Sequence, residues 1–147
     1  MGCFTEINVN FDLVKDTPKD VIDIMHYLIL SNGNETKPSV LPKHEFFECD
    51  RWDSVACCSS YYFDRLSNSK MEYNEISKTY RVSIRTDLKN YDSEIEKFLD
   101  WLLPYINSNG FIGYKRHEDM DNPTLIYIEV DDALRKKEVL FKTPTFE

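Results

Sequence analysis

Apolar and polar residues alternate along residues 6–13, EINVNFDL, with the two-residue period of a strand that is covered on one side. The apolar face of this strand holds Ile7, Val9, Phe11 and Leu13. Its polar face holds Glu6, Asn8, Asn10 and Asp12. We expect the polar face to meet water.

Two helices are predicted from apolar residues that recur every three or four positions. The first has Thr17 as its N-cap and Pro18 at its first position, and it ends at the SNGN stretch of residues 31–34. The second spans residues 91–106 with Asp92 as its N-cap. Pro104 is expected to kink or shorten it, because the proline ring displaces the hydrogen bond to the carbonyl four residues earlier.

Four further segments favour strands, through β-branched and aromatic content or through alternation. They are residues 55–63, 78–86, 111–118 and 124–130. The polar residues 64–77 are expected to connect the first pair as a long hairpin loop, and residues 119–123, DMDNP, to form the turn of the second pair. Residues 133–142 favour a last strand over a helical tail. Residues 35–55 contain two prolines and predict an irregular connection.

This order of elements predicts a single α+β domain over residues 1–147. The expected architecture is a ferredoxin-like sandwich, in which an antiparallel sheet carries two helices on one face and an added edge strand. Because this fold hosts many unrelated functions, it does not by itself indicate what the protein does.

Composition narrows the function classes. The chain has 147 residues, of which 41% are hydrophobic, and this is enough for a sizeable core. A net charge of −8 argues against direct nucleic-acid binding, which depends on lysine and arginine. The sequence shows neither a signal peptide nor an apolar stretch long enough to span a membrane, so we expect a cytoplasmic protein with its four cysteines reduced.

The segment 43–65, KHEFFECDRWDSVACCSSYYFDR, is dense in cysteines and aromatic residues. A zinc site would need His44, Cys49, Cys57 and Cys58 as ligands. Their spacing does not fit the short ligand pairs of structural zinc, and Cys57 and Cys58 would point to opposite faces of a strand. We therefore predict no metal site in the chain.

Catalytic chemistry also finds little support in the sequence. A nucleophilic cysteine would pair Cys49, Cys57 or Cys58 with His26, His44 or His117, but none of these cysteines begins a predicted helix that could activate its thiol. Two groups of carboxylates, on the second helix and in the last hairpin, are typical of solvated surfaces. They are Glu94, Glu96 and Asp100, and Glu118, Asp119 and Asp121. No catalytic residue and no cofactor is predicted.

The same segment contains residue types that are enriched at protein interfaces, namely aromatic residues and arginine. The predicted binding residues are Arg51, Trp52, Tyr61, Tyr62 and Arg65. On the predicted strand 55–63, one face would supply the core and the other would bind a partner. The alternative interpretation is that Trp52 only covers the sheet as part of the core.

Five stretches in order, DRW, SSYYF, LKNYDSEIEKFLDWLLPYI, GYKRHE and NPTLIY, resemble the pattern of an uncharacterised family of small hypothetical proteins of bacteria and of phages or other mobile elements. The resemblance spans residues 44–128, and His117 stands where the pattern has an aromatic residue. No known function comes with it. It implies a context in which small acidic proteins occupy the surface of a host protein, including inhibitors of antiviral defence.

The sequence thus favours a non-catalytic protein-binding factor, such as a phage or mobile-element accessory protein that inhibits a host defence protein. Two alternatives remain open: a small enzyme with a Cys/His or pocket-based site on the sheet face, and a protein that binds or sequesters a small ligand. A host protein is the expected partner, and a homodimer is also compatible with the sequence.

Overall fold

The computed structural model describes residues 3–30, 37–59 and 67–144. The longer elements are β1 (Thr5–Asp12), α1 (Lys19–Leu30), β2 (Lys70–Asn74), β3 (Thr79–Leu88), α2 (Glu94–Leu102), β4 (Gly110–His117), β5 (Thr124–Asp131) and β6 (Lys136–Lys142). Three short 3₁₀ helices accompany them: η1 (Glu45–Glu48), η2 (Trp52–Ser54) and η3 (Leu103–Tyr105).

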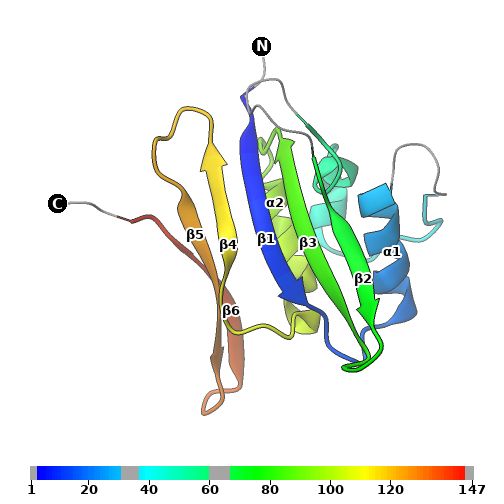
Figure 1. Cartoon of the computed structure of the whole chain (residues 1–147). Helices are drawn as coiled ribbons and strands as arrows, with labels where there is room; N and C mark the ends of the chain where they lie inside the picture. The colour runs from blue at the N-terminus through cyan, green and yellow to red at the C-terminus, as the bar shows by residue number, and fades with distance from the viewer. Residues whose placement is uncertain (1–2, 31–36, 60–66, 145–147) are drawn as a thin grey trace.

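The six strands form one antiparallel sheet in the order β2-β3-β1-β4-β5-β6 (Figure 1). The first four strands and the two helices have the connectivity of a ferredoxin-like fold, because β1 and β2 flank β3 while β3 and β4 flank β1. The predicted fold class is confirmed. Beyond the ferredoxin-like core the sheet has two strands rather than one added edge strand, since residues 136–142 also pair with β5.

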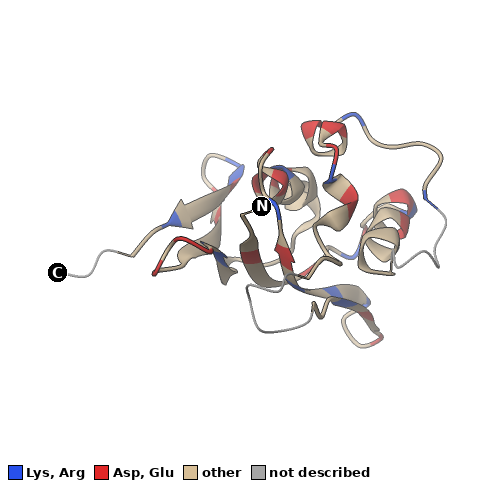
Figure 2. Ribbon diagram, turned by 90° about the horizontal axis from the view of Figure 1, so that it is seen from above, with Lys and Arg blue, Asp and Glu red and all other residues tan. Residues whose placement is uncertain are grey.

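The two faces of the sheet differ. Apolar residues of β1 and β3, such as Val9 and Ile84, are fully buried beneath the helices. Seen from above, the helices form one layer on one side of the sheet (Figure 2). Acidic residues occur on α1 and on the short helices of residues 45–54. We call the other side of the sheet, where Asn8 and Asn10 lie as predicted, the open face.

One predicted strand is wrong in its described part. Residues 55–59, which begin the predicted strand 55–63, form a turn and an irregular stretch, and residues 60–63 lie outside the described residues. The strand that pairs with β3 is β2, inside the predicted connection 64–77. Val55 and Ala56 are buried, so their apolar side chains serve the core under the helices rather than the sheet. Tertiary burial here outweighs local β propensity.

The second helix differs from the prediction at its start. Its N-cap is Ser93, in the left-handed region at φ 59°, and not Asp92. The side chain of Asn90 accepts a hydrogen bond from the Ile95 amide at 2.9 Å, which replaces the expected aspartate cap. At the other end, Pro104 shortens the helix as predicted, because α2 stops at Leu102 and continues as η3.

Candidate functional site

The aromatic residues of η1 and η2 belong to the core. Phe46 is fully buried, and its ring lies 5.4 Å from that of Phe98 and 6.0 Å from that of Trp101, centroid to centroid. Trp52 is only 5% exposed and packs against Phe47 at 5.2 Å. We call these five residues the buried aromatic cluster. Trp52, predicted as a binding residue, is therefore a core residue, in agreement with the alternative interpretation.

Arg51 lies beside this cluster and is exposed, with its guanidinium 5.5 Å from the centroid of the Tyr91 ring. The other predicted binding residues, Tyr61, Tyr62 and Arg65, lie outside the described residues. The structure thus places one of the five predicted binding residues on the described surface.

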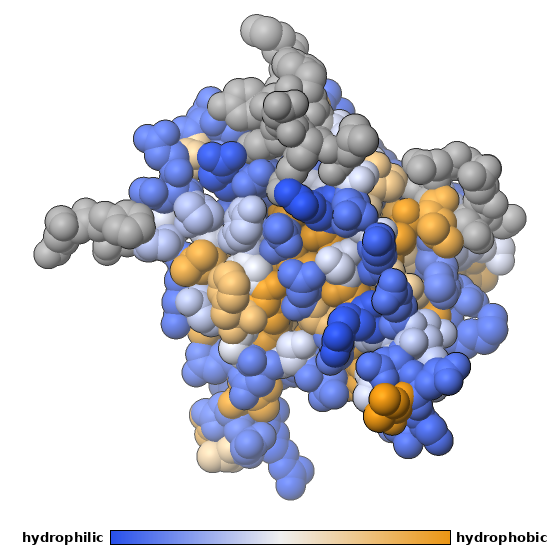
Figure 3. All heavy atoms as spheres, viewed as in Figure 1, coloured by the Kyte–Doolittle hydropathy of each residue, from blue (hydrophilic) through white to orange (hydrophobic). Residues whose placement is uncertain are grey.

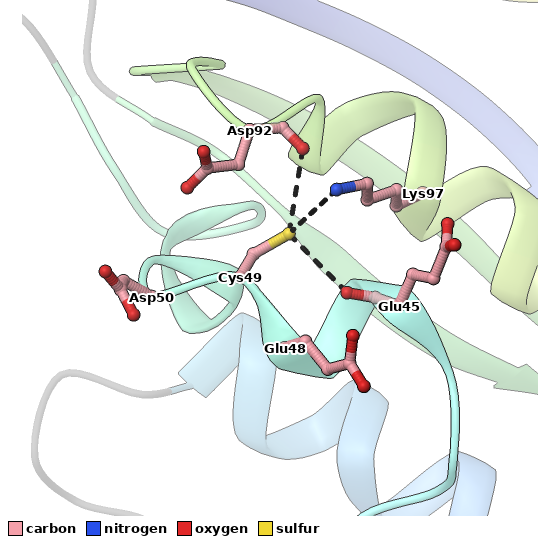
Figure 4. A pocket seen from close by; sticks show the side chains of 6 residues that line it. All are labelled: Glu45, Glu48, Cys49, Asp50, Asp92 and Lys97. Carbon is pink, nitrogen blue, oxygen red and sulfur yellow. Dashed lines mark hydrogen bonds between the residues drawn. The ribbon is translucent and has the colours of Figure 1, made fainter.

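A pocket of about 360 Å³ surrounds Cys49, between η1 and the start of α2 (Figure 4). Its lining is mostly acidic: Glu45, Glu48, Cys49, Asp50, Asp92 and Lys97. The Cys49 thiol lies 3.7 Å from the Glu45 carbonyl oxygen and 3.8 Å from the Asp92 carbonyl oxygen, and Lys97 Nζ lies 3.8 Å from Sγ. Burial raises the pKa of Cys49 despite the nearby Lys97 charge, which disfavours the thiolate form that a nucleophile requires.

The other candidate zinc ligands have local partners. His44 Nε2 lies 2.8 Å from an Asp100 carboxylate oxygen, and its Nδ1 accepts the Phe46 amide at 3.0 Å, which caps η1. The Cys57 thiol donates to the Asp53 carbonyl oxygen at 3.3 Å. Within the part of the chain that the structure describes, His44, Cys49, Cys57 and Cys58 do not converge on a common point where an ion could bind.

The carboxylates of α2 are not all solvated, contrary to the prediction. Glu94 is fully buried and accepts the Asp92 amide at 3.1 Å. Glu96 pairs with Lys115 of β4 and accepts the Asn90 side chain at 3.0 Å. Burial alone would raise the pKa of Glu96, but the bonds from Lys115 and Asn90 outweigh it and lower that pKa. The ion pair between Glu96 and Lys115 links β4 to α2.

An apolar surface lies elsewhere, on the open face of β4, β5 and β6. Because Tyr114 stands opposite Asn8, it shares the open face with that polar residue of β1. The register then places four more apolar residues beside it, in neighbouring cross-strand positions. We call this set the open-face patch: Phe111, Tyr114, Leu125, Tyr127 and Leu140.

Two members of the open-face patch are in contact, and all five are at least partly accessible. The rings of Phe111 and Tyr127 are 5.6 Å apart, and Phe111 is 58% exposed. Lys142 Nζ lies 4.9 Å from the Tyr127 ring centroid, at the margin of the patch. Figure 3 looks onto this face and shows apolar side chains over the left and centre of the sheet, between hydrophilic regions.

The remaining open face, over β2, β3 and β1, is polar. Arg81 pairs with Asp12 at 3.2 Å, and Arg116 pairs with Glu6 at 3.3 Å where β1 meets β4. Arg85 is exposed in the same row of β3 as Arg81. The open face therefore combines a charged half with an apolar half.

A sequence signal for the open-face patch exists in residues 124–130, TLIYIEV. Leu125 and Tyr127 alternate with Ile126 and Ile128, so the strand is apolar on both faces. The helix side buries Ile126 and Ile128, whereas Leu125 and Tyr127 stay partly exposed. Strands that are apolar on both faces are typical of sheets that are covered on both faces.

Known proteins give no further guidance: no family, no curated protein and no solved structure matches the chain. In the described segments, none of the helices has the length and the apolar content that a membrane crossing requires.

Proposed function

We propose that this protein is a non-catalytic factor that binds another protein through the open-face patch. The observation that carries the proposal is the contact between exposed Phe111 and partly exposed Tyr127 within an apolar row that crosses three strands. Exposing such a row to water costs about 25 cal/mol for each Å² of apolar area. A partner that covers the row would recover this free energy on binding.

The chemistry of the patch favours a protein partner. Aromatic and aliphatic side chains form its centre, while Lys142 and Arg116 stand at its margin, as in interfaces with an apolar centre and a polar rim. Nucleic acid would require a surface rich in lysine and arginine, and the chain carries a net charge of −8.

The enzyme alternative gains no support at Cys49. Burial raises the pKa of its thiol, and its sulfur is held by the carbonyl oxygens of Glu45 and Asp92. The proposal also includes a host protein as the partner and a role in blocking antiviral defence in the host cytoplasm. Both of these parts rest on the family resemblance of residues 44–128.

The test is a capture experiment from extracts of a bacterial host, followed by affinity measurements with the captured protein. The test variant is Phe111→Ser with Tyr127→Ser. The matched control is Ile76→Ser with Leu134→Ser, because Ile76 and Leu134 are exposed apolar residues outside the patch, at 96% and 64%. Truncation of two interface aromatics should weaken binding several hundredfold, since such anchors contribute about 2 kcal/mol or more each.

The control variant should bind within about twofold of the wild type. Undiminished binding by the patch variant, with its fold verified by circular dichroism, would remove the proposal. Loss of binding in Arg51→Ala alone would instead favour the surface predicted from the sequence.

A further inference from the structure

The N-terminal end of β1 lies beside the last residues of β4 (Figure 1), and three side chains of types that can bind metals come from this region. Thr5 pairs with His117, and the Glu118 amide continues this register by donating to the Phe4 carbonyl oxygen at 3.0 Å. One further step along both chains brings Cys3 opposite Asp119. Since side chains alternate between faces, Cys3, His117 and Asp119 are directed to the same side.

Their donor atoms are close enough to share an ion. One ligand atom from each of Cys3, His117 and Asp119 lies within 4.8 Å of the other two. Tetrahedral zinc, with bonds of about 2.0–2.3 Å, separates its ligand atoms by roughly 3.3–3.8 Å. Cys3 and Asp119 are exposed and His117 is partly exposed, so modest side-chain rotations can close this difference.

The position of each ligand is partly fixed before an ion arrives. The Cys3 amide donates to the Tyr91 hydroxyl at 2.8 Å, which anchors the segment ahead of β1. His117 Nδ1 accepts the Asp119 amide at 3.1 Å and lies 3.8 Å from an Asp119 carboxylate oxygen. In this tautomer the Nδ1 lone pair is taken up by the Asp119 amide and Nε2 carries the proton, so an ion that binds at Nδ1 has to displace that amide bond.

The charges around the thiol favour a cation. The Glu118 and Asp119 carboxylates lie near the Cys3 thiol and place negative charge beside it. A divalent ion would neutralise this negative charge.

We propose that Cys3, His117 and Asp119 bind a divalent transition-metal ion of the zinc class, with water as the fourth ligand. A thiolate, an imidazole and a carboxylate are the ligand types that zinc takes in proteins. The ion links the beginning of β1 to the turn after β4. It therefore stabilises the pairing of these two strands, which connects β2, β3 and β1 to β4, β5 and β6. Binding is coupled to folding, because the unfolded chain separates Cys3 from His117 by more than a hundred residues.

Titration with cobalt(II) tests the site, because a cobalt–thiolate bond produces a charge-transfer absorption band that carboxylates and imidazole alone do not give. Wild-type protein, reduced and freed of metal, should bind one equivalent of cobalt(II) with this band, and zinc should displace it. Cys3→Ser should abolish the band, and His117→Ala should weaken binding at least tenfold, while Cys57→Ser, a partly buried cysteine elsewhere, should leave both unchanged.

Zinc should also raise the melting temperature of the wild type and not that of Cys3→Ser, since a ligand stabilises the state that binds it. Cys3 is exposed, so its substitution by serine should leave the circular dichroism spectrum of the metal-free protein unchanged. A band that persists in Cys3→Ser, or wild-type binding no tighter than that of His117→Ala, would overturn the proposal.

Discussion

Two groups of aromatic side chains in this protein have opposite relations to water. The buried aromatic cluster joins η1 and η2 to α2, and its central residue Phe46 has no exposed surface. The open-face patch on β4, β5 and β6 leaves Phe111 more than half exposed. Aromatic residues are frequent in both places, so composition alone does not distinguish a core from a binding surface. What distinguishes them is whether another layer of the fold lies above them.

Phe46→Ala, in the buried aromatic cluster, is expected to lower the stability of the fold most. This substitution leaves a cavity among Phe98, Trp101 and Phe47, so the free energy of unfolding should fall by about 3–5 kcal/mol. Urea denaturation followed by tryptophan fluorescence measures it. A loss below about 1 kcal/mol would mean that residues 45–54 are not part of the core.

The next largest loss of stability is expected where β1 pairs with β4, between the two halves of the sheet. Gly113 of β4 has φ 152°, and a Cβ atom there would lie 1.9 Å from the Asn8 carbonyl oxygen of β1. Gly113→Ala should therefore force β1 and β4 apart and cost about 3 kcal/mol or more. Gly110→Ala is the matched control, since Gly110 also has positive φ, at 94°, but its Cβ would meet nothing within 4 Å.

Gly110→Ala should cost only about 1 kcal/mol through backbone strain. Thermal unfolding of the two variants separates the effects, and equal melting temperatures would show that β1 and β4 do not approach as closely as described.

A smaller effect should follow from the ion pair that fastens β4 to α2. Glu96→Gln removes the charge that Lys115 and Asn90 stabilise, and should cost about 1 kcal/mol at neutral pH. Because the folded-state pKa of Glu96 lies below its ordinary value, the contribution is complete above that ordinary value and is lost as the pH falls through the folded-state pKa. Stability curves of the two proteins should converge in that acid range. A constant difference down to the lowest pH would exclude Glu96 ionisation as its source.

The smallest effect on stability is expected in the open-face patch. Phe111→Ala removes a side chain that is 58% exposed, so the free energy of unfolding should change by less than about 1 kcal/mol. The same urea titration checks this. A loss as large as that of Phe46→Ala would mean that this face is already covered within the folded chain.

The sequence predicts the regular part of the fold well, because alternation in residues 6–13 and helical spacing in α1 and α2 are local signals that the packing reinforces. It fails at residues 55–59, where β-favouring residues are buried beneath helices instead of pairing in the sheet. Burial of that kind depends on contacts such as the hydrogen bond from Thr86 Oγ1 to the Val55 carbonyl oxygen at 2.7 Å, between residues 31 positions apart. Such a long-range contact cannot be predicted from the local pattern of apolar and polar residues.

The candidate site shows the same limit. Density of aromatic residues directs attention to Trp52, but η1 and η2 turn this segment inward against α2. The open-face patch becomes visible only once the register of β4, β5 and β6 is known, because its members come from three strands. One local sign of the patch can be read from the sequence, because residues 124–130 have apolar side chains on both faces of the strand.

The measurement that tests the central claim most directly is oxidative footprinting of the protein alone and with its captured partner. In the free protein, Phe111 and Tyr127 should be labelled while Trp52 and Trp101 stay protected until denaturant is added. With the partner bound, labelling of Phe111 and Tyr127 should fall and that of Ile76 should not change. Labelling of Phe111 and Tyr127 that stays the same on binding, together with new protection of Tyr91 beside Arg51, would contradict the account.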